Sequence, residues 1–329
     1  MAKNIRANDL EVNMKNFKQI MITAALCGIS LTSFAGEKID EAMTANGINA
    51  VNVENVSGEV TIIGTDGDSI TVKGELSDKA KKFVFKKDGN QMRISVDMPH
   101  RYNHSNNDKG SVFTVRMPKS IRMNFNGVST DVIVKDLTNN VEVRTVSGDI
   151  SAENLAEHIE LDTVSGEIDA ENLSGKIRLS TVSGDIEDKN SKGRLQLKAV
   201  SGDIRSKSSA EEAFISVISG SARFKLAEVE ELVVTSVSGD VKGELTLLDE
   251  GEVKVSGVSS DISLAFQGEV SANFRLTASA GGDLENRLTN DRAKRAKYGP
   301  SSKLNFSTGN GSASVKGSVV SGEIRISER

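Results

Sequence analysis

The chain has 329 residues and a net charge of −5, so its surface is acidic on average and nucleic acid is excluded as a general partner. Aromatic residues make up only 4% of the chain and tryptophan is absent, which disfavours a binding cleft built from aromatic side chains. The 29 glycines and 3 prolines fit a fold with many tight bends and few rigid linkers.

Residues 1–35 have the pattern of a secretory signal peptide. Lys15 and Lys18 precede an apolar stretch over residues 20–34, and small residues stand at the end of that stretch, before Gly36. We therefore expect cleavage before Gly36, export to the periplasm or the cell exterior, and no membrane span in the mature chain. An uncleaved anchor is the alternative.

Cys27 is the only cysteine, and it lies inside the predicted signal peptide. A lipoprotein signal needs a small residue directly before the cysteine, and Leu26 occupies that position. The chain is therefore not expected to carry a lipid, and the mature protein is expected to contain no disulfide.

Residues 36–127 predict irregular β-rungs that form the first end of the fold. Strand-like apolar runs recur here, but without a fixed spacing. His100 and His104 lie in a polar segment, and two histidines four residues apart could share a metal ion only on a helix. Nothing in this region predicts a helix, so we interpret the segment as a solvated loop.

Residues 128–283 carry a repeat with an 18-residue period. The phrase Val-Ser-Gly-Asp, or Val-Ser-Gly-Glu, begins at residues 146, 164, 182 and 200, and related phrases begin at 128 and 218. The later steps lengthen to 19 residues at Val237 and 21 residues at Val258. Self-similarity at a fixed period indicates a repeat architecture rather than an isolated motif.

Apolar residues fall in columns when the repeats are aligned. The columns are Val141, Ile159, Ile177, Leu195; Val143, Leu161, Leu179, Leu197; Val146, Val164, Val182, Val200; and Ile150, Ile168, Ile186, Ile204. Each repeat reads as two nine-residue halves, each a short strand followed by a glycine-centred bend. Strand alternation places Ile159 and Leu161 on one face, with Glu160 and Asp162 pointing outward.

One such unit cannot bury its own apolar face, whereas a stack of copies can. The sequence therefore predicts an all-β fold, a parallel β-solenoid with 18-residue rungs rising about 4.8 Å each. Helical repeats are excluded, because β-branched residues and the Ser-Gly-Asp bend interrupt every helical window. Asn154, Asn172 and Asn190 are expected to form turns in the left-handed conformation.

Residues 284–329 predict a basic loop followed by a final capping rung from Val315 to Ile326. The loop holds the basic cluster of the chain, Arg287, Arg292, Lys294, Arg295 and Lys297. Two interpretations stay open: a lid over the last rungs, or a contact for an anionic polymer such as lipopolysaccharide or an acidic glycan.

Three phrases resemble the bacterial DUF4097 family. They are Val-Arg-Met-Pro at residues 115–118, the iterated Thr-Val-Ser-Gly-Asp-Ile, and Val-Ser-Gly-Glu-Ile-Arg-Ile at residues 320–326. Members of that family are described as β-strand-repeat or "putative adhesin" proteins, and the resemblance covers nearly all of the chain after residue 35. It implies a single-stranded parallel β-helix, with right-handed coiling favoured, and it supplies no catalytic residues.

The acids of the repeated phrase form one more column, namely Asp131, Asp149, Glu167, Asp185 and Asp203. Like charges at this spacing repel by about 1 kcal/mol per solvated pair, which calcium could relieve. Calcium-binding β-repeats carry Gly-Gly-x-Gly-x-Asp in every half, whereas here only one half carries an acid. We therefore favour turn chemistry over a calcium site, and expect no cofactor.

Two function classes remain. A non-enzymatic structural or adhesin-like surface would use repeated weak contacts, with the column Thr145, Thr163 and Thr181 and the serines beside it as one candidate face. Its partner would be a cell-surface glycan or another envelope component. The alternative is a polysaccharide-binding or polysaccharide-cleaving β-helix, but no nucleophile and base stand apart from the repeats, and His158 is isolated.

Overall fold

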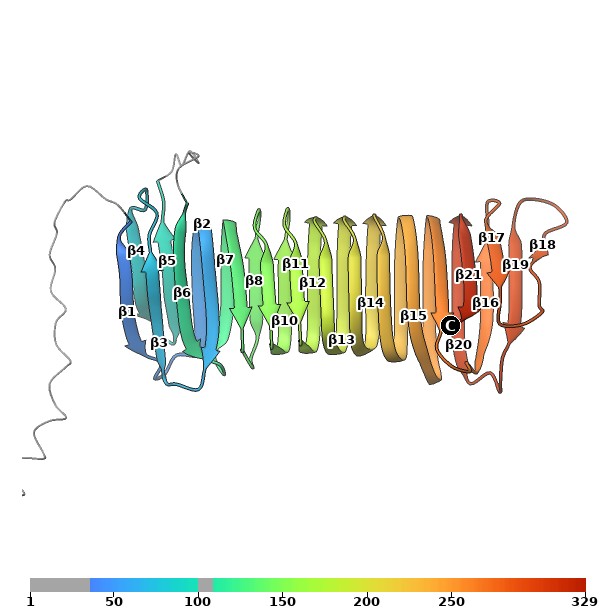
Figure 1. The fold of residues 1–329 in the computed structure, drawn as a ribbon, viewed down its shortest axis with the longest axis horizontal. Helices are drawn as coiled ribbons and strands as arrows, with labels where there is room; N and C mark the ends of the chain where they lie inside the picture. The colour runs from blue at the N-terminus through green and yellow to red at the C-terminus, as the bar shows by residue number, and fades with distance from the viewer. Residues whose placement is uncertain (1–35, 100–108) are drawn as a thin grey trace, which may run out of the picture. The chain divides into compact units, whose positions relative to one another are not determined.

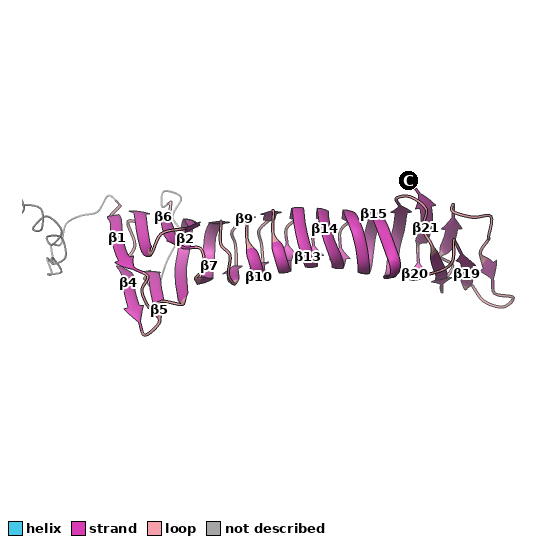
Figure 2. Cartoon of the chain, turned by 90° about the horizontal axis from the view of Figure 1, so that it is seen from below, coloured by secondary structure: helices cyan, strands magenta, loops and turns pink. Residues whose placement is uncertain are grey.

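The computed structural model describes residues 36–99 and 109–329, which belong to one compact unit from Gly36 to Arg329. The predicted signal peptide and the loop with His100 and His104 lie outside the described residues. All regular structure in the described part is β-strand, so the all-β prediction is confirmed (Figure 2). None of the described residues forms a helix long and apolar enough to span a membrane.

The strands are numbered in chain order. They are β1 (Lys38–Thr44), β2 (Ala50–Thr65), β3 (Ser69–Glu75), β4 (Lys82–Asp88), β5 (Gln91–Asp97), β6 (Ser111–Pro118), β7 (Arg122–Lys135), β8 (Val141–Thr145), β9 (Ile150–Glu153), β10 (Ala156–Thr163), β11 (Ile168–Glu171), β12 (Ser174–Ser183), β13 (Ile186–Ser201), β14 (Ile204–Ser219), β15 (Ala222–Phe266), β16 (Ala272–Ala278), β17 (Asp283–Asn286), β18 (Lys294–Arg295), β19 (Ser302–Ser307), β20 (Ala313–Ser321) and β21 (Glu323–Glu328).

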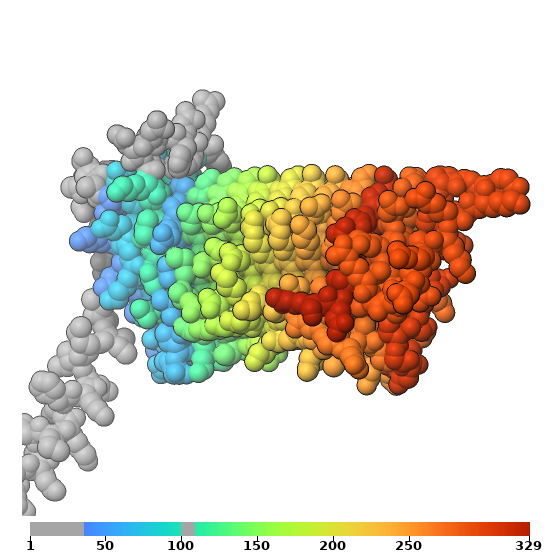
Figure 3. Space-filling view, turned by 45° about the vertical axis from the view of Figure 1, so that its right-hand side comes forward, coloured from blue at the N-terminus to red at the C-terminus, as the bar shows by residue number. Residues whose placement is uncertain are grey.

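Successive repeats pair in parallel with an offset of one period. Strand β10 pairs with β12 so that Ile159 lies beside Ile177, and β11 pairs with β13 so that Ile168 lies beside Ile186. Each repeat is therefore one rung, made of two strand segments joined by bends, and the rungs line up side by side in chain order from β7 to β15 (Figure 1). The space-filling view shows the same rungs as adjacent bands of colour (Figure 3).

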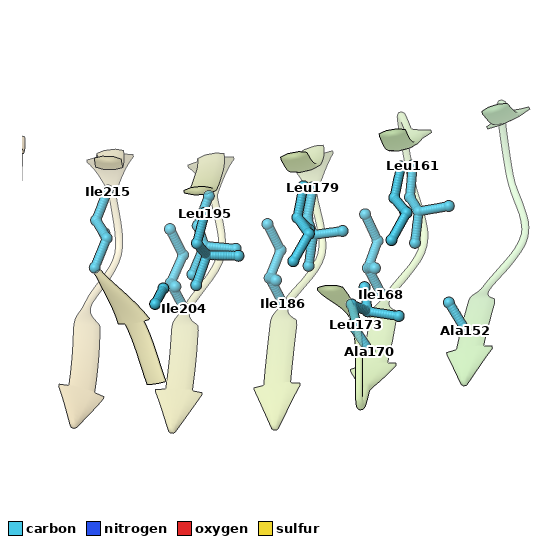
Figure 4. Close-up of a cluster of buried hydrophobic side chains, with 14 of the residues drawn as sticks. Ala152, Leu161, Ile168, Ala170, Leu173, Leu179, Ile186, Leu195, Ile204 and Ile215 are labelled. Atoms are coloured by element: carbon cyan, nitrogen blue, oxygen red, sulfur yellow. The ribbon is translucent and has the colours of Figure 1, made fainter. Parts of the chain in front are cut away.

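The core lies between the two segments of each rung. Leu161, Leu179 and Leu195 project from one set of segments toward the isoleucines of the other set, and the pattern repeats from rung to rung (Figure 4). These side chains are buried, and burying one leucine or isoleucine contributes roughly 1.5–3 kcal/mol. The alternation predicted for Ile159 and Leu161 is confirmed, because both are fully buried while Glu160 and Asp162 face outward.

The valine column of the repeated phrase is not part of this core, which corrects the sequence analysis. Val146, Val164 and Val182 are 47%, 43% and 45% exposed. Strand alternation explains the error: Ile159, Leu161 and Thr163 point inward, so the next residue, Val164, points outward. The alignment shows that the valines recur, but it does not show whether each valine falls on an inward or an outward position of its strand.

The threonines take the buried position instead. Thr145, Thr163 and Thr181 are almost completely buried, and each hydroxyl donates a hydrogen bond to a backbone carbonyl of the preceding rung. Thr163 Oγ1, for example, lies 3.1 Å from the carbonyl oxygen of Gly148. These threonines therefore satisfy buried backbone groups, and they are not available as the binding face that the sequence analysis considered.

The glycine of the phrase is required by the close approach of neighbouring rungs. A Cβ atom built on Gly184 would lie 2.1 Å from the carbonyl oxygen of Gly166, far inside van der Waals contact. The asparagine bends are formed differently, because Asn154, Asn172 and Asn190 adopt φ values of 56°, 57° and 58°. The prediction that these asparagines accommodate left-handed turns is confirmed.

The C-terminal strands do not form the last rung, contrary to the expectation from the sequence. Strand β20 pairs in parallel with both β15 and β16, so that Val315 lies between Val253 and Phe274, and β21 lies likewise between β15 and β17. The C-terminal rung is thus inserted between two rungs that precede it in the chain (Figure 1). The long connection after β17 makes this possible, since it lets the chain return past a rung already formed.

At the N-terminal end, too, one strand lies between strands that are not its neighbours in the sequence. Strand β2 pairs in parallel with β7 on one side and with β5 and β6 on the other, although β5 and β6 lie between them in the sequence. Antiparallel strands then cover the ends: β4 pairs with β5, β3 with β6, β1 with β3, and at the other end β19 with β16. Covered ends protect the open hydrogen-bonding edges of the parallel stack.

Candidate functional site

The acidic column is engaged in holding rungs together. The carboxylate of Asp149 accepts a hydrogen bond from the backbone amide of Glu167 at 2.9 Å, and Asp185 and Asp203 accept the amides of Asp203 and Ser221 at 2.8 Å and 2.9 Å. Arg205 lies across two members of the column, 2.9 Å from Asp185 and 3.1 Å from Asp203. The amide hydrogen bond lowers the pKa of Asp185, and Arg205 lowers it further.

The geometry of this column favours the hypothesis that its acids stabilise the bends over the hypothesis that they bind calcium. One oxygen of each of these aspartates points at a backbone amide, and Arg205 supplies the cation between two of them. Among residues 36–99 and 109–329, no group of three or more His, Cys, Asp or Glu is placed to hold a metal ion.

The basic cluster lies in the connection between β17 and β19, at the C-terminal end of the stack (Figure 1). All five cluster side chains are exposed. Arg287 pairs with Glu285 at 2.7 Å and Arg295 pairs with Asp283 at 3.3 Å, whereas Lys297 lies over the ring of Tyr298, 5.4 Å from its centroid. Lys294 and Arg295 pair through their backbone with β19. The cluster is therefore partly neutralised and lies outside the regular rungs.

A group of charges around Arg144 was not singled out from the sequence. The guanidinium of Arg144 lies 3.3 Å from Glu160 and 3.6 Å from Asp162, and it also contacts Glu142. Partial burial raises the pKa of Asp162, and the neighbouring Glu160 carboxylate raises it further. The signal that would have found this group is the register of the stack, which places residue 144 directly beside residue 162.

A groove runs along the outer surface of the stack, over β13, β14 and β15. Its volume is about 820 Å³. It begins beside residues 187–190, crosses residues 205–207, 223–225, 242–244 and 263–265, and ends at Ser327. Those segments are neighbours in the stack, because Arg205 pairs with Arg223 and Ile262 pairs with Ile324. The groove therefore follows the direction in which the rungs are stacked.

Cationic side chains line the first part of this groove. They are Lys189, Arg205, Lys207, Arg223, Lys225 and Lys242, and all six are exposed. Three acids, Glu187, Asp188 and Glu244, lie among these cations, and the uncharged Ser263 and Ala265 line the part of the groove next to Ser327. Sequence reasoning missed this site, because each rung contributes only one or two cations and the cluster appears only when the rungs are placed side by side.

Together these features define, over residues 36–99 and 109–329, a repeat protein of parallel strand segments whose candidate sites lie on its outer faces. The chain belongs to the family described as Toastrack DUF4097, whose model matches residues 48–327. The resemblance seen in the sequence is thereby confirmed. Among curated proteins, none matches the chain.

Solved structures of low similarity include three bacterial proteins. A Bacteroides fragilis protein described as a "putative adhesin" is 13% identical with a TM-score of 0.35, and the match covers 89% of this chain and 97% of that one. A Clostridium sporogenes "putative cell adhesion protein" is 11% identical with a TM-score of 0.25, covering 90% and 100%. A Parabacteroides merdae "putative adhesin" is 10% identical with a TM-score of 0.28, covering 70% and 92%.

Proposed function

We propose that this protein is an exported, non-enzymatic β-solenoid that acts as an adhesin-like binding surface for an envelope component or a cell-surface glycan. The observation that carries the proposal is the parallel pairing of successive rungs at an offset of one period, unbroken between β10, β12 and β13 and interrupted by local register shifts between β13 and β14. It repeats outward side chains at about 4.8 Å from rung to rung. Such a surface binds by adding many weak contacts along an extended partner.

The solenoid part of the proposal is supported by the parallel pairing of each repeat with the next at an offset of one period. We take the coil to be a single-stranded, right-handed parallel β-helix, with 36–127 and 284–329 as its two end regions and 128–283 as its regular part. Export is supported by Lys15, Lys18 and the apolar stretch that follows them.

The non-enzymatic part is supported by what the acids do. The carboxylates of Asp149, Asp185 and Asp203 accept hydrogen bonds from backbone amides. In the groove over β13 to β15, cations outnumber the acids Glu187, Asp188 and Glu244. A glycan array probed with the purified protein tests the proposal directly. Selective binding of the protein to one class of immobilised glycan is the expected result. A blank array together with no binding to bacterial envelopes contradicts the proposal.

A polysaccharide-cleaving activity is the second candidate, and the Arg144 group is the observation that favours it. Asp162 has a raised pKa beside the Glu160 carboxylate and an arginine, which is the composition of a general acid with a charged neighbour. Release of reducing ends or unsaturated products from polygalacturonate or alginate would establish this activity. We expect no release, because Arg144 also neutralises the carboxylates it contacts.

The basic cluster is tested separately. Replacing Arg287, Arg292, Lys294, Arg295 and Lys297 with glutamine removes five positive charges from one loop. If binding to the glycan found on the array is lost at unchanged thermal stability, the cluster is a polymer contact. If binding is retained and the melting temperature falls, the loop is a lid.

A further inference from the structure

The groove over β13, β14 and β15 has an uneven charge along its length. On the rungs before it, the same outward positions carry Glu153, Asp169 and Glu171. The pairing then replaces these acids by cations, since Glu187 lies beside Arg205, and Lys189 beside Lys207. The sign of this face therefore changes at the rung of β13, and a negatively charged ligand is repelled before that rung and attracted after it.

The cations are arranged in two rows. Arg205 and Arg223 are register partners in one row, and Lys207 and Lys225 are register partners in the other. Neighbours within a row are about 4.8 Å apart, the spacing of adjacent strands. A ligand that places one negative charge at each such step can meet several cations at once.

Some of these cations are not neutralised by the protein. Lys207 and Lys242 have no ion-pair partner among the described residues, whereas Lys225 lies at a long 3.8 Å from Glu244. The other groove cations are paired: Arg205 lies 2.9 Å from Asp185 and 3.1 Å from Asp203, Arg223 lies 3.8 Å from Asp203, and Lys189 lies 2.6 Å from Glu187. The groove thus keeps a local positive charge on a protein whose net charge is negative.

The groove wall is otherwise mostly carbon. The aliphatic stems of the exposed lysines and arginines supply its accessible apolar surface, because Phe224, Gly243 and Leu264 beneath them are buried. Gly243 allows Phe224 to lie close, because a Cβ at residue 243 would come within 2.3 Å of that ring. Apolar surface beside regularly spaced cations suits a sugar ring that carries a carboxylate, which presents C–H faces as well as charge.

We propose that this groove binds a linear, carboxylated polysaccharide lying along the stack, from Lys189 toward Ala265. The inference rests on the proposed function and names its ligand class and its site. A polyuronate carries one carboxylate per sugar, and one sugar is close in length to the rise of one rung. The groove crosses several neighbouring rungs, so several sugars are bound together.

The test compares two triple variants of the full protein. The first replaces Lys207, Lys225 and Lys242 with glutamine inside the groove. The control makes the same replacement at Lys176, Lys192 and Lys198, which are exposed and lie outside the groove. Both variants lose the same charge, so they share the same general electrostatic effect on a polyanion. Binding of polygalacturonate oligomers is measured by titration calorimetry, with neutral dextran as the negative probe.

The groove variant is expected to bind polygalacturonate about tenfold more weakly, a loss of about 1.4 kcal/mol spread over three exposed charge contacts. The control variant is expected to stay within about twofold of the unchanged protein. Removing one of the acids that line the groove, by Glu244→Gln, is expected to strengthen binding, because Lys225 and Arg329 are then released from their shared carboxylate. This gain cannot arise from misfolding.

Three results would overturn the inference. One is equal weakening by the groove and control variants, which would make the binding a general charge effect. Another is equal or tighter binding of polyphosphate or single-stranded DNA of the same charge, which would remove the preference for sugars. The third is no binding of polygalacturonate by the unchanged protein. If the protein at the same time binds a neutral glycan on the array, the proposed adhesin-like function stands and only the groove assignment fails.

Discussion

Gly184→Ala is expected to unfold the central rungs at a much lower denaturant concentration than the unchanged protein. The new methyl group would lie 2.1 Å from the carbonyl oxygen of Gly166 and 2.7 Å from its carbonyl carbon, where ordinary contact begins at 3.4 Å. Those atoms are backbone, so no side chain can rotate away to make room. The two rungs must move apart by about an ångström at this bend.

The cost can be worked from the contacts that this movement strains. Overpacking of this kind typically costs about 1–3 kcal/mol. The bend also holds two hydrogen bonds between rungs, from the amide of Ser183 to Val164 at 2.8 Å and from the amide of Gly184 to Ser201 at 3.2 Å. Each is worth about 0.5–1.5 kcal/mol, so the expected loss of stability is about 2–6 kcal/mol.

Gly67→Ala is the matched control. Gly67 has an ordinary φ and is exposed in the bend between β2 and β3, and the atom nearest to its new methyl group would be the Thr65 hydroxyl oxygen, 3.6 Å away. Its replacement is expected to change stability by less than about 0.5 kcal/mol. Urea unfolding followed by circular dichroism measures both variants. If Gly184→Ala and Gly67→Ala unfold at the same midpoint, the close approach of the rungs is not what requires glycine in the repeated phrase.

Three further predictions concern the core, the buried acid and calcium. Leu179→Ala is expected to cost about 2–5 kcal/mol, whereas Val182→Ala, three residues later, is expected to cost less than about 0.5 kcal/mol; equal losses in urea unfolding would contradict the outward valine column. Burial raises the pKa of Asp188 above its ordinary 3.8, so its stabilising contribution is present at low pH and is lost as pH rises through the raised pKa. Asp188→Asn is therefore expected to gain stability relative to the unchanged protein toward neutral pH in thermal melts, and a parallel pH dependence of the two proteins would refute this. Calcium is expected to leave the melting midpoint unchanged, because Asp149, Asp185 and Asp203 already accept backbone amides, and a rise in the midpoint with calcium would restore the calcium site.

Asp188 also shows how a repeat can be altered locally without losing its register. Its position is held by Ala152 and Ala170 in earlier rungs, and its carboxylate accepts hydrogen bonds from Ser191 and from Ser206, the latter at 2.7 Å. The hydroxyl groups of these two serines donate the hydrogen bonds that the buried carboxylate requires. A sequence alignment of the repeats shows the acid in an apolar column, but it does not show which hydroxyls surround it.

The exposure of the valines follows from strand alternation, which the aligned repeats do not show. A repeat alignment records which residues recur, whereas burial depends on the parity of each residue along its strand. Val164 follows the inward Thr163 directly, so it must point outward. The threonine hydroxyl can be buried because a carbonyl of the preceding rung accepts its hydrogen bond.

The sequence by itself determined the all-β class, the 18-residue step, the inward leucine and isoleucine columns and the asparagine bends, because each of these depends on residues close together in the chain or on an offset that repeats. Only the tertiary structure decided the order of the rungs at both ends, where β2 and β20 pair with strands distant in the sequence. It also decided the cationic groove, since lysines 18 residues apart, such as Lys207 and Lys225, become neighbours only through the pairing of whole rungs. The physical reason is that local preference fixes the shape of one rung, whereas contacts between rungs depend on which free edges the chain can reach and cover.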